Sequence, residues 1–236
     1  MFTNNKEEKV NVVGYDEYSD IAVLAVEKDK VISVAATGSS ENMRIGDTTF
    51  AVGTPVDSSI YSWSVTRGIL SGKNRMVQVD NYVMSVLQTD TAINSGNSGG
   101  PLCNANGEVI GITNMKLASS QIEGMGFAIP IEDALKNAET IISGKKISRP
   151  YIGVSIYDAT NFFSGETGLY VEYVESNGPA DKAGIKKGDK IIKVGDVEVS
   201  NSSYFRYQLY KYDIGDKVKI TVSRNGSEKT LTVTLT

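Results

Sequence analysis

Short apolar segments that end at glycine-containing turns constrain the fold of this chain more than any other sequence feature. The chain has 23 glycines among 236 residues, so turns are frequent and long helical patterns are few. One strand-like segment after another favours a β-barrel or a β-sandwich over a fold in which strands and helices alternate. We expect strands at residues 10–13, 21–26, 48–52, 65–70, 76–79, 83–88 and 109–113, with turns at residues 14–20 and around Ser71-Gly72.

One segment in the middle of the chain breaks this pattern. Apolar residues recur at helical spacing over residues 131–142, and Gly144 supplies a stop signal for the helix. The polar segment 144–150 that follows has the character of a linker. We therefore predict two domains, which cover residues 1–148 and 149–236.

The second domain is also predicted to be rich in β-structure. Apolar and polar residues alternate over residues 217–222 and again over residues 231–235, as they do in half-buried strands. Residues 202–212 favour a helix, because Phe205 and Leu209 lie four residues apart on one face. From the residues alone, this domain is a small sandwich or barrel with one helix.

Composition argues against several classes of function. The formal net charge is −4 and no stretch concentrates Lys and Arg, so we expect no nucleic-acid partner. Cys103 is the single cysteine, which excludes an internal disulfide, and we expect it to be a small buried residue. With no histidine in the sequence we expect no zinc site and no cofactor. No apolar run approaches ~18 residues, and residues 1–9 contain no secretory signal.

The most informative stretch for chemistry runs from Gln88 to Leu102 and contains Asn-Ser-Gly-Asn-Ser-Gly-Gly-Pro. Glycines on both sides of Ser98 allow the backbone N–H groups of Gly96, Asn97 and Ser98 to point toward one place beside the serine hydroxyl. A nucleophile beside convergent N–H groups suits acyl transfer, because these donors stabilise the oxyanion that develops. The alternative for an isolated Gly-x-Ser-Gly-Gly is a turn between strands.

The stretch Thr89–Leu102 resembles the active-site loop of chymotrypsin-fold serine proteases, and in particular of the HtrA (Deg) family. Three further parts of the chain match in the expected order. They are Ser19–Leu24, Gly124–Pro130 and the C-terminal half, which resembles a PDZ domain. The resemblance implies a mainly β fold, in which a chymotrypsin-like double β-barrel with an incomplete first barrel precedes the PDZ domain.

Serine proteolysis requires a base that takes the serine proton and an acid that orients this base. By the resemblance, Asp20 is the catalytic aspartate and Ser98 is the nucleophile. On its own Asp20 also suits a turn residue that caps a strand. Asp16 is the nearest competitor, but only Asp20 directly precedes the apolar run 21–26.

The histidine that should act as the base is missing. In the family it precedes the aspartate, within a segment like Thr-Asn-x-His-Val, and this sequence has no such segment. One explanation is truncation, which the intact serine loop favours. The other is a pseudo-protease that keeps the scaffold for binding. A Ser–Lys arrangement would need a lysine such as Lys116 beside Ser98, and nothing in the sequence places one there.

The resemblance also implies a substrate pocket and its preference. The pocket would be built from Ile93, Asn94, Phe127, Ala128 and Ile129, and family members prefer small aliphatic residues in exposed or unfolded segments. No acidic residue lies among residues 92–94, so a preference for Lys or Arg is not expected. Phe127 also suits a residue of the barrel core.

The PDZ resemblance rests on residues 178–189 and 190–199. It implies that a peptide C-terminus adds to a sheet edge as an extra strand. The carboxylate would be bound by the backbone of Tyr151, Ile152, Gly153 and Val154. Helix residues such as Phe205 and Leu209 would line the apolar pocket, unless they are ordinary core residues.

Together these features predict an HtrA-like serine endopeptidase that acts on unfolded or exposed polypeptide and binds peptide C-termini. The alternative function is a non-catalytic peptide-binding protein. The resemblance implies an extracytoplasmic location, and also oligomers, since family members often form trimers through N-terminal residues absent from this sequence.

Overall fold

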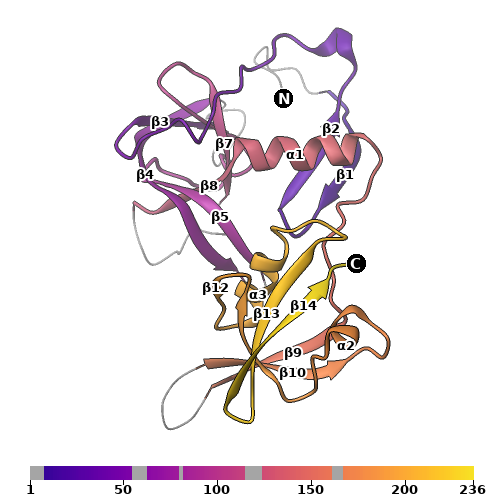
Figure 1. Cartoon of the computed structure of the whole chain (residues 1–236). Coiled ribbons are helices and arrows are strands. Elements are labelled where there is room, and N and C mark those ends of the chain that lie inside the picture. The colour runs from indigo at the N-terminus through magenta and orange to yellow at the C-terminus, as the bar shows by residue number, and fades with distance from the viewer. Residues whose placement is uncertain (1–7, 55–62, 80–81, 115–123, 161–166) are drawn as a thin grey trace. The chain divides into compact units, whose positions relative to one another are not determined.

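The computed structural model describes residues 8–54, 63–79, 82–114, 124–160 and 167–236 (Figure 1). Contacts divide the chain into a first unit of residues 1–79 and 84–147 and a second unit of residues 80–83 and 148–236. The domain limits 1–148 and 149–236 remain a prediction.

The first unit contains a closed β-barrel with the strand order β3-β4-β5-β8-β7-β6. Its interior is filled by apolar side chains from alternate strand positions, among them Leu70, Leu102, Ile110 and Ala128, which are fully buried. The expectation of a mainly β barrel is thus confirmed. The strands are β3 (Thr48–Gly53), β4 (Ser64–Val79), β5 (Tyr82–Thr89), β6 (Pro101–Cys103), β7 (Val109–Asn114) and β8 (Gly126–Pro130).

The predicted turn around Ser71-Gly72 is wrong, because β4 continues through it. Leu70 and Gly72 are both buried and lie two residues apart, so they share the inward face of one strand. A Cβ at Gly72 would lie 2.5 Å from Nε of Arg75. The glycine therefore makes room for a neighbouring side chain inside a strand and does not mark a turn.

A separate two-stranded antiparallel sheet, β1 (Asn11–Asp16) and β2 (Ile21–Ala25), precedes the barrel, and a 3₁₀ turn over Lys28–Lys30 follows it. The predicted turn over residues 14–20 is too long. β1 continues through Gly14 to Asp16, because a bulge between Val12 and Gly14 keeps the strand paired with β2.

Helix α1 (Ile131–Ile142) occurs where it was predicted and covers one face of this hairpin. Ile21 of β2 packs with Ile129 and Ala134, and a Cβ at Gly14 would lie 2.8 Å from Cγ2 of Ile141. The opposite face of the hairpin carries Val12, Tyr15 and Leu24, whose exposed fractions are 65%, 67% and 56%.

The second unit is built on a sheet with the order β14-β13-β11-β10-β9, in which β9 is an edge strand and β12 pairs with β11. Side chains of both the sheet and the helices form its core. Leu169, Ile191 and Ile220 of the sheet and Phe205 of α3 are almost completely buried. The predicted helix over residues 202–212 ends earlier than expected. The elements are β9 (Val154–Thr160), β10 (Thr167–Val174), α2 (Pro179–Ala183), β11 (Lys190–Val194), β12 (Val197–Glu198), α3 (Ser202–Leu209), β13 (Lys217–Arg224) and β14 (Ser227–Thr234).

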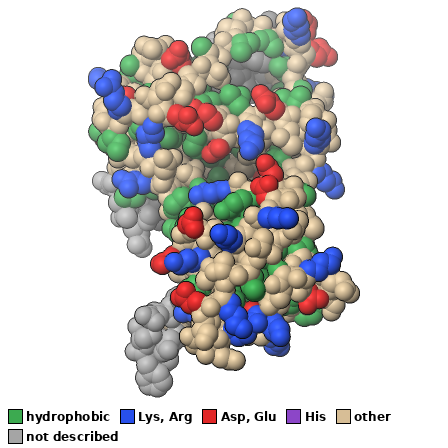
Figure 2. All heavy atoms as spheres, viewed as in Figure 1, with side chains coloured by type: hydrophobic (Ala, Val, Ile, Leu, Met, Phe, Trp, Pro, Cys, Tyr) green, Lys and Arg blue, Asp and Glu red, His purple; other side chains and the backbone are tan. Residues whose placement is uncertain are grey.

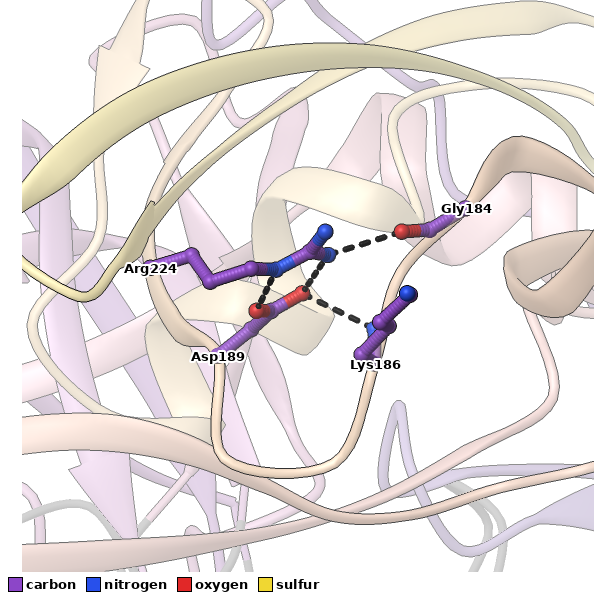
Figure 3. A network of polar contacts seen from close by, with 4 residues as sticks. All are labelled: Gly184, Lys186, Asp189 and Arg224. Carbon is purple, nitrogen blue, oxygen red and sulfur yellow. Dashed lines mark hydrogen bonds and ion pairs between the residues drawn. The ribbon is translucent and has the colours of Figure 1, made fainter.

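An ion pair between buried Asp189 and half-buried Arg224 ties the loop after α2 to strand β13 (Figure 3). Nε and Nη2 of Arg224 donate to Oδ1 and Oδ2 of Asp189 over 2.6 and 2.7 Å. Nη2 also donates to the Gly184 carbonyl, and the Lys186 N–H donates to Oδ2 of Asp189. Burial by itself would raise the pKa of the Asp189 carboxyl, but the hydrogen bonds from Arg224 and Lys186 outweigh it and hold this pKa below its ordinary value.

Basic and acidic side chains are interspersed on the face shown in Figure 2. No helix in the described part of the chain is both long and apolar enough to cross a membrane. No group of three or more His, Cys, Asp or Glu side chains within the described ranges could hold a metal ion.

Candidate active site and peptide groove

The loop that carries Ser98 is fixed from both sides by one residue of strand β7. The Gly99 N–H donates to the Thr113 carbonyl over 2.8 Å, and the Thr113 N–H donates to the Gly100 carbonyl over 2.9 Å. The buried Thr113 hydroxyl is also hydrogen-bonded to the carbonyls of Asn97 and Gly100. Ser98 lies between the loop residues that bond to Thr113, and its side chain is exposed. Thr113 thus presents the serine on a rigid turn.

Inside the loop, hydrogen bonds between Asn94 and Asn97 close a tight turn. The Asn97 N–H donates to the Asn94 carbonyl over 3.1 Å, and the Asn97 side chain bonds to the Asn94 N–H and the Ala92 carbonyl. The Gly96 carbonyl accepts from the Thr54 N–H over 2.9 Å. The Asn97 N–H is therefore occupied in this conformation. The Gly96 N–H has no acceptor among the described residues, so it is available as an oxyanion donor, and the role of the Ser98 N–H stays a prediction.

The residues before the loop are anchored by a buried cluster of threonine hydroxyls. The Thr49 hydroxyl lies 2.9 Å from that of Thr89 and 2.7 Å from that of Thr91, and all three side chains are buried. The Thr89 hydroxyl donates in addition to the Ile69 carbonyl over 2.7 Å. Because buried hydroxyls need partners, this cluster holds the start of the loop on β3 and β4.

Asp16 and Asp20 have different environments. Oδ2 of Asp16 accepts from both the N–H and the hydroxyl of Ser19, so Asp16 closes the hairpin turn. Asp20 has a backbone φ of 52° and its Oδ2 accepts from Nδ2 of Asn114 over 2.9 Å. Both residues thus belong to the hairpin connection: Asp16 at the end of β1 caps the turn, and Asp20, the last residue of the turn, also bonds to Asn114 at the end of β7.

Sequence reasoning did not single out Thr113 or Asn114. Both are buried polar residues at the end of an apolar strand. Two polar residues at the end of such a strand were the feature of the sequence that could have indicated a functional position. Asn114 is 4% exposed and its Oδ1 has no hydrogen-bond partner in the described part of the chain. An unpaired buried acceptor is costly, so this position is a candidate for a role beyond packing.

Two further predictions concern Lys116, as a possible base, and Cys103, as a small buried residue. Lys116 lies outside the described residues. Cys103 is buried as expected, and burial raises the pKa of its thiol.

The side chains proposed for the substrate pocket lie mostly in the interior. Ala128 belongs to the barrel core, against which Ile93 packs. Phe127 packs on Val86, and Ile129 packs on the hairpin and α1. Any contact of β8 with a substrate therefore falls to its backbone in this conformation, and the pocket assignment stays a prediction.

In the second unit, the predicted carboxylate loop lies at the start of edge strand β9. The carbonyls of Ile152 and Gly153 accept from the N–H groups of Ala180 and Glu175, over 2.8 and 2.9 Å. The N–H groups of Ile152 and Gly153 have no acceptors among the described residues, whereas their carbonyls are held by the body of the unit. The Tyr151 N–H is not available, because it donates to the Thr236 carbonyl.

A groove of about 400 Å³ extends from this loop between β9 and α3. The predicted residues come together here as expected. Phe205 and Leu209 line the groove and are at the same time 2% and 4% exposed members of the core. Gly153 has a φ of +77°, a conformation that side chains disfavour, and Glu175 lies directly behind it. The groove is lined by Pro150, Tyr151, Ile152, Gly153, Val154, Ser155, Ile156, Phe205, Arg206, Leu209 and Tyr210.

Comparison with known sequences agrees with this geometry. Residues 1–112 match the trypsin-like peptidase domain family and residues 150–235 match the PDZ domain family. The chain is 41% identical over 251 residues to the serine protease Do-like HtrB of Bacillus subtilis, and the match covers 99% of this chain and 55% of HtrB. It is 37% identical over 242 residues to a probable periplasmic DegP-like serine endoprotease of Rickettsia prowazekii, and here the match covers 99% of this chain and 47% of the relative. The chain thus spans about half the length of these relatives.

Among solved structures, the HtrA-type protease AlgW with a decapeptide superposes with a TM-score of 0.76 at 33% identity, over 99% of this chain and 73% of AlgW. A trypsin-like domain is thus followed by a PDZ domain, and the whole chain aligns with HtrA proteins in sequence and in structure. The protein belongs to the HtrA family of serine proteases.

Proposed function

We propose that this chain provides the nucleophile Ser98 and the orienting carboxylate Asp20 of a serine endopeptidase that cuts unfolded or exposed polypeptide. One observation carries the proposal: Thr113 and Asn114 are consecutive residues of β7, and they contact the Ser98 loop and Asp20 respectively. Adjacent positions on one strand thereby couple the two candidate groups, as a catalytic constellation requires.

In the proposed reaction Ser98 Oγ attacks the peptide carbonyl while a base takes its proton. The N–H groups of Gly96 and Ser98 would stabilise the oxyanion. Asp20 would orient the base and stabilise its charged form. These 236 residues contain no histidine, so a histidine base would have to be supplied by a polypeptide segment outside them.

The proposal predicts that the chain alone does not hydrolyse unfolded casein above a Ser98→Ala control. A chimaera in which upstream residues of Bacillus subtilis HtrB precede Met1 should gain activity, and Ser98→Ala should abolish that gain. Hydrolysis by the chain alone that Ser98→Ala removes would show that another group acts as the base.

The second candidate function is binding without catalysis, as in a pseudo-protease. The absence of histidine from the sequence favours it, as does a peptide groove built entirely from residues of this chain. A folded chimaera that binds peptides and stays inactive would select this alternative over the enzyme.

We further propose that the groove binds peptide C-termini and that substrates are cut beside small aliphatic residues. The edge position of β9 and the unpaired N–H groups of Ile152 and Gly153 support the first point. The solved AlgW complex with a decapeptide is in line with it. The periplasmic designation of the Rickettsia relative supports an extracytoplasmic location, and a homo-oligomer stays a prediction.

A further inference from the structure

A hydrogen-bond clasp joins the two walls of the peptide groove. Asp158 of β9 accepts two hydrogen bonds from Ser202, the first residue of α3. Oδ1 accepts from the Ser202 N–H and Oδ2 from the Ser202 hydroxyl, each over 2.7 Å. Both residues are exposed or half-buried, so the clasp lies at the surface. Within the described residues Asp158 forms no ion pair, so its negative charge has no cationic partner there.

The clasp lies at the end of the groove that is remote from the carboxylate loop. The groove is lined by β9 as far as Ile156 and by α3 from Phe205 onward. Asp158 is two residues beyond Ile156 and therefore on the same face of the strand. Ser202 lies almost one turn before Phe205 on α3. Strand β9 and helix α3 thus both extend beyond the residues that line the groove, and the contact between Asp158 and Ser202 closes the groove at this end.

The register of an added strand places a defined peptide residue at this end. With its carboxylate at the N–H groups of Ile152 and Gly153, the peptide runs antiparallel to β9. Its last residue then lies opposite Val154, its third-last residue opposite Ile156 and its fifth-last residue opposite Asp158. Directly opposed residues share one face of a sheet and their side chains interact. At about 3.4 Å per residue, Asp158 lies about 14 Å along the strand from Val154.

We propose that Asp158 makes this groove selective at the fifth residue from the peptide C-terminus, where it favours Lys or Arg and disfavours Asp or Glu. This inference rests on the proposed binding of peptide C-termini. A cationic side chain would add a charge-assisted hydrogen bond to a carboxylate that already holds two neutral donors. An acidic side chain would place like charges opposite each other.

Two other charged side chains border the groove. Glu175 lies behind Gly153 at the carboxylate end, and Arg206 lines the α3 wall. Glu175 is thus at the opposite end of the groove, whereas Arg206 lies one helical turn from Ser202 on the same face of α3. A preference carried by Arg206 would have the opposite sign, because a cation favours acidic peptide residues.

The test is calorimetric titration of the full chain with six-residue peptides that share a free carboxylate and an apolar last residue. The fifth-last residue is Lys, Ala or Glu. At low salt we expect the Lys peptide to bind about tenfold more tightly than the Glu peptide. In 0.5 M salt the ratio should fall severalfold, since exposed charges are screened. A ratio that is insensitive to salt would contradict a role for charge.

Matched variants assign the preference to one residue. Asp158→Asn keeps an oxygen that can accept from Ser202, and it should reduce the ratio to less than about twofold. Asp196→Asn, in the exposed β11–β12 turn, should leave it unchanged. Ser202→Ala keeps the Asp158 charge and should also retain the preference. Discrimination that survives Asp158→Asn would overturn the assignment.

A four-residue peptide separates failure of this inference from failure of the proposed groove, because it ends before the clasp. It should bind wild type and Asp158→Asn equally well. If it binds while the longer peptides show no charge preference, selection by Asp158 is wrong. If no free-acid peptide binds, the peptide-binding function itself is wrong.

Discussion

The β1–β2 hairpin and the closed barrel are built from strands of similar apolar character, yet they bury it very differently. In the barrel, Leu70 and Leu102 are 0% exposed. In the hairpin, Val12 and Leu24 are direct cross-strand partners, and 65% and 56% of their surfaces are exposed. Closure of the barrel covers both the edges and the inner faces of its strands, whereas α1 covers the hairpin on one face only. An apolar strand pattern therefore specifies a strand but not what covers it.

The same contrast separates the two candidate sites. The peptide groove obtains its strand edge, its free N–H groups and its apolar wall from residues of this chain. The site at Ser98 has a rigid nucleophile loop and an oriented Asp20, but its base is not in the sequence. The following predictions test this difference, beginning with the largest effect.

In a chimaera that has regained activity, Asp20→Asn should lower kcat by roughly 10⁴, because the base would lose its orienting carboxylate. Asp16→Asn is the matched control, since Asp16 was the nearest competitor by sequence and its carboxylate accepts both hydrogen bonds from Ser19 in the turn. Casein cleavage by both variants provides the measurement. Similar rates for the two would remove the distinction between Asp16 and Asp20.

Asp189→Ala should destabilise the second unit by about 1.5–3 kcal/mol, because it removes the hydrogen bonds that the buried carboxylate accepts from the half-buried Arg224 guanidinium and the Lys186 N–H. Hydrogen exchange of β11 and β13 amides in increasing urea measures this loss. Asp196→Ala, at an exposed turn, is the control and should change stability by less than about 0.5 kcal/mol. A small effect at Asp189 would mean that the ion pair contributes little.

The Asp189–Arg224 pair also predicts a pH dependence of stability. The pKa of Asp189 is lower in the folded state than its ordinary value, so the folded state favours the ionised carboxyl. The resulting stabilisation is present above about pH 4, the ordinary value, and is lost as the pH falls through the folded pKa. Urea unfolding between about pH 7 and pH 2 should show a larger loss in wild type than in Asp189→Ala, because Glu132, whose pKa is also lowered, contributes equally to both.

Amidation of a peptide C-terminus should weaken binding to the groove by about 1.5–3 kcal/mol, because the N–H groups of Ile152 and Gly153 would lose a charged acceptor. Gly153→Val should weaken binding of the acid peptide as well, since residue 153 requires a positive φ. Calorimetry on residues 149–236, which we expect to fold alone, compares the two peptides. Equal affinities would show that the terminus is not recognised.

The smallest effect concerns the exposed face of the hairpin. Leu24→Ser should change the free energy of unfolding by no more than about 0.5 kcal/mol, because the side chain is already mostly exposed. The amides of residues 11–25 should exchange faster than those of β7 in the barrel. Protection of the hairpin equal to that of β7 would mean that it is covered in solution, and a concentration series would show whether a second copy covers it.

The sequence by itself determined the local elements and the identity of the chemical groups. Helix α1 and strands such as β2 and β13 follow from the period of their apolar residues, and the Ser98 loop and the PDZ-like half follow from their motifs. Where glycine was taken for a turn, at Gly14 and Gly72, the prediction was wrong. Strand pairing keeps both residues in β-structure, where the absence of a side chain serves close packing.

Only the tertiary structure decided which groups act together. The contacts of Thr113 with the Ser98 loop, the contact of Asn114 with Asp20 and the Asp158–Ser202 clasp all join residues that are far apart in the sequence. The hydrogen bond from the Tyr151 N–H to the Thr236 carbonyl is likewise long-range, and it occupies one of the predicted carboxylate donors in this conformation. The physical reason is that hydrogen-bond partners and burial depend on long-range strand register and closure, whereas residue periodicity reports only on the segment that carries it.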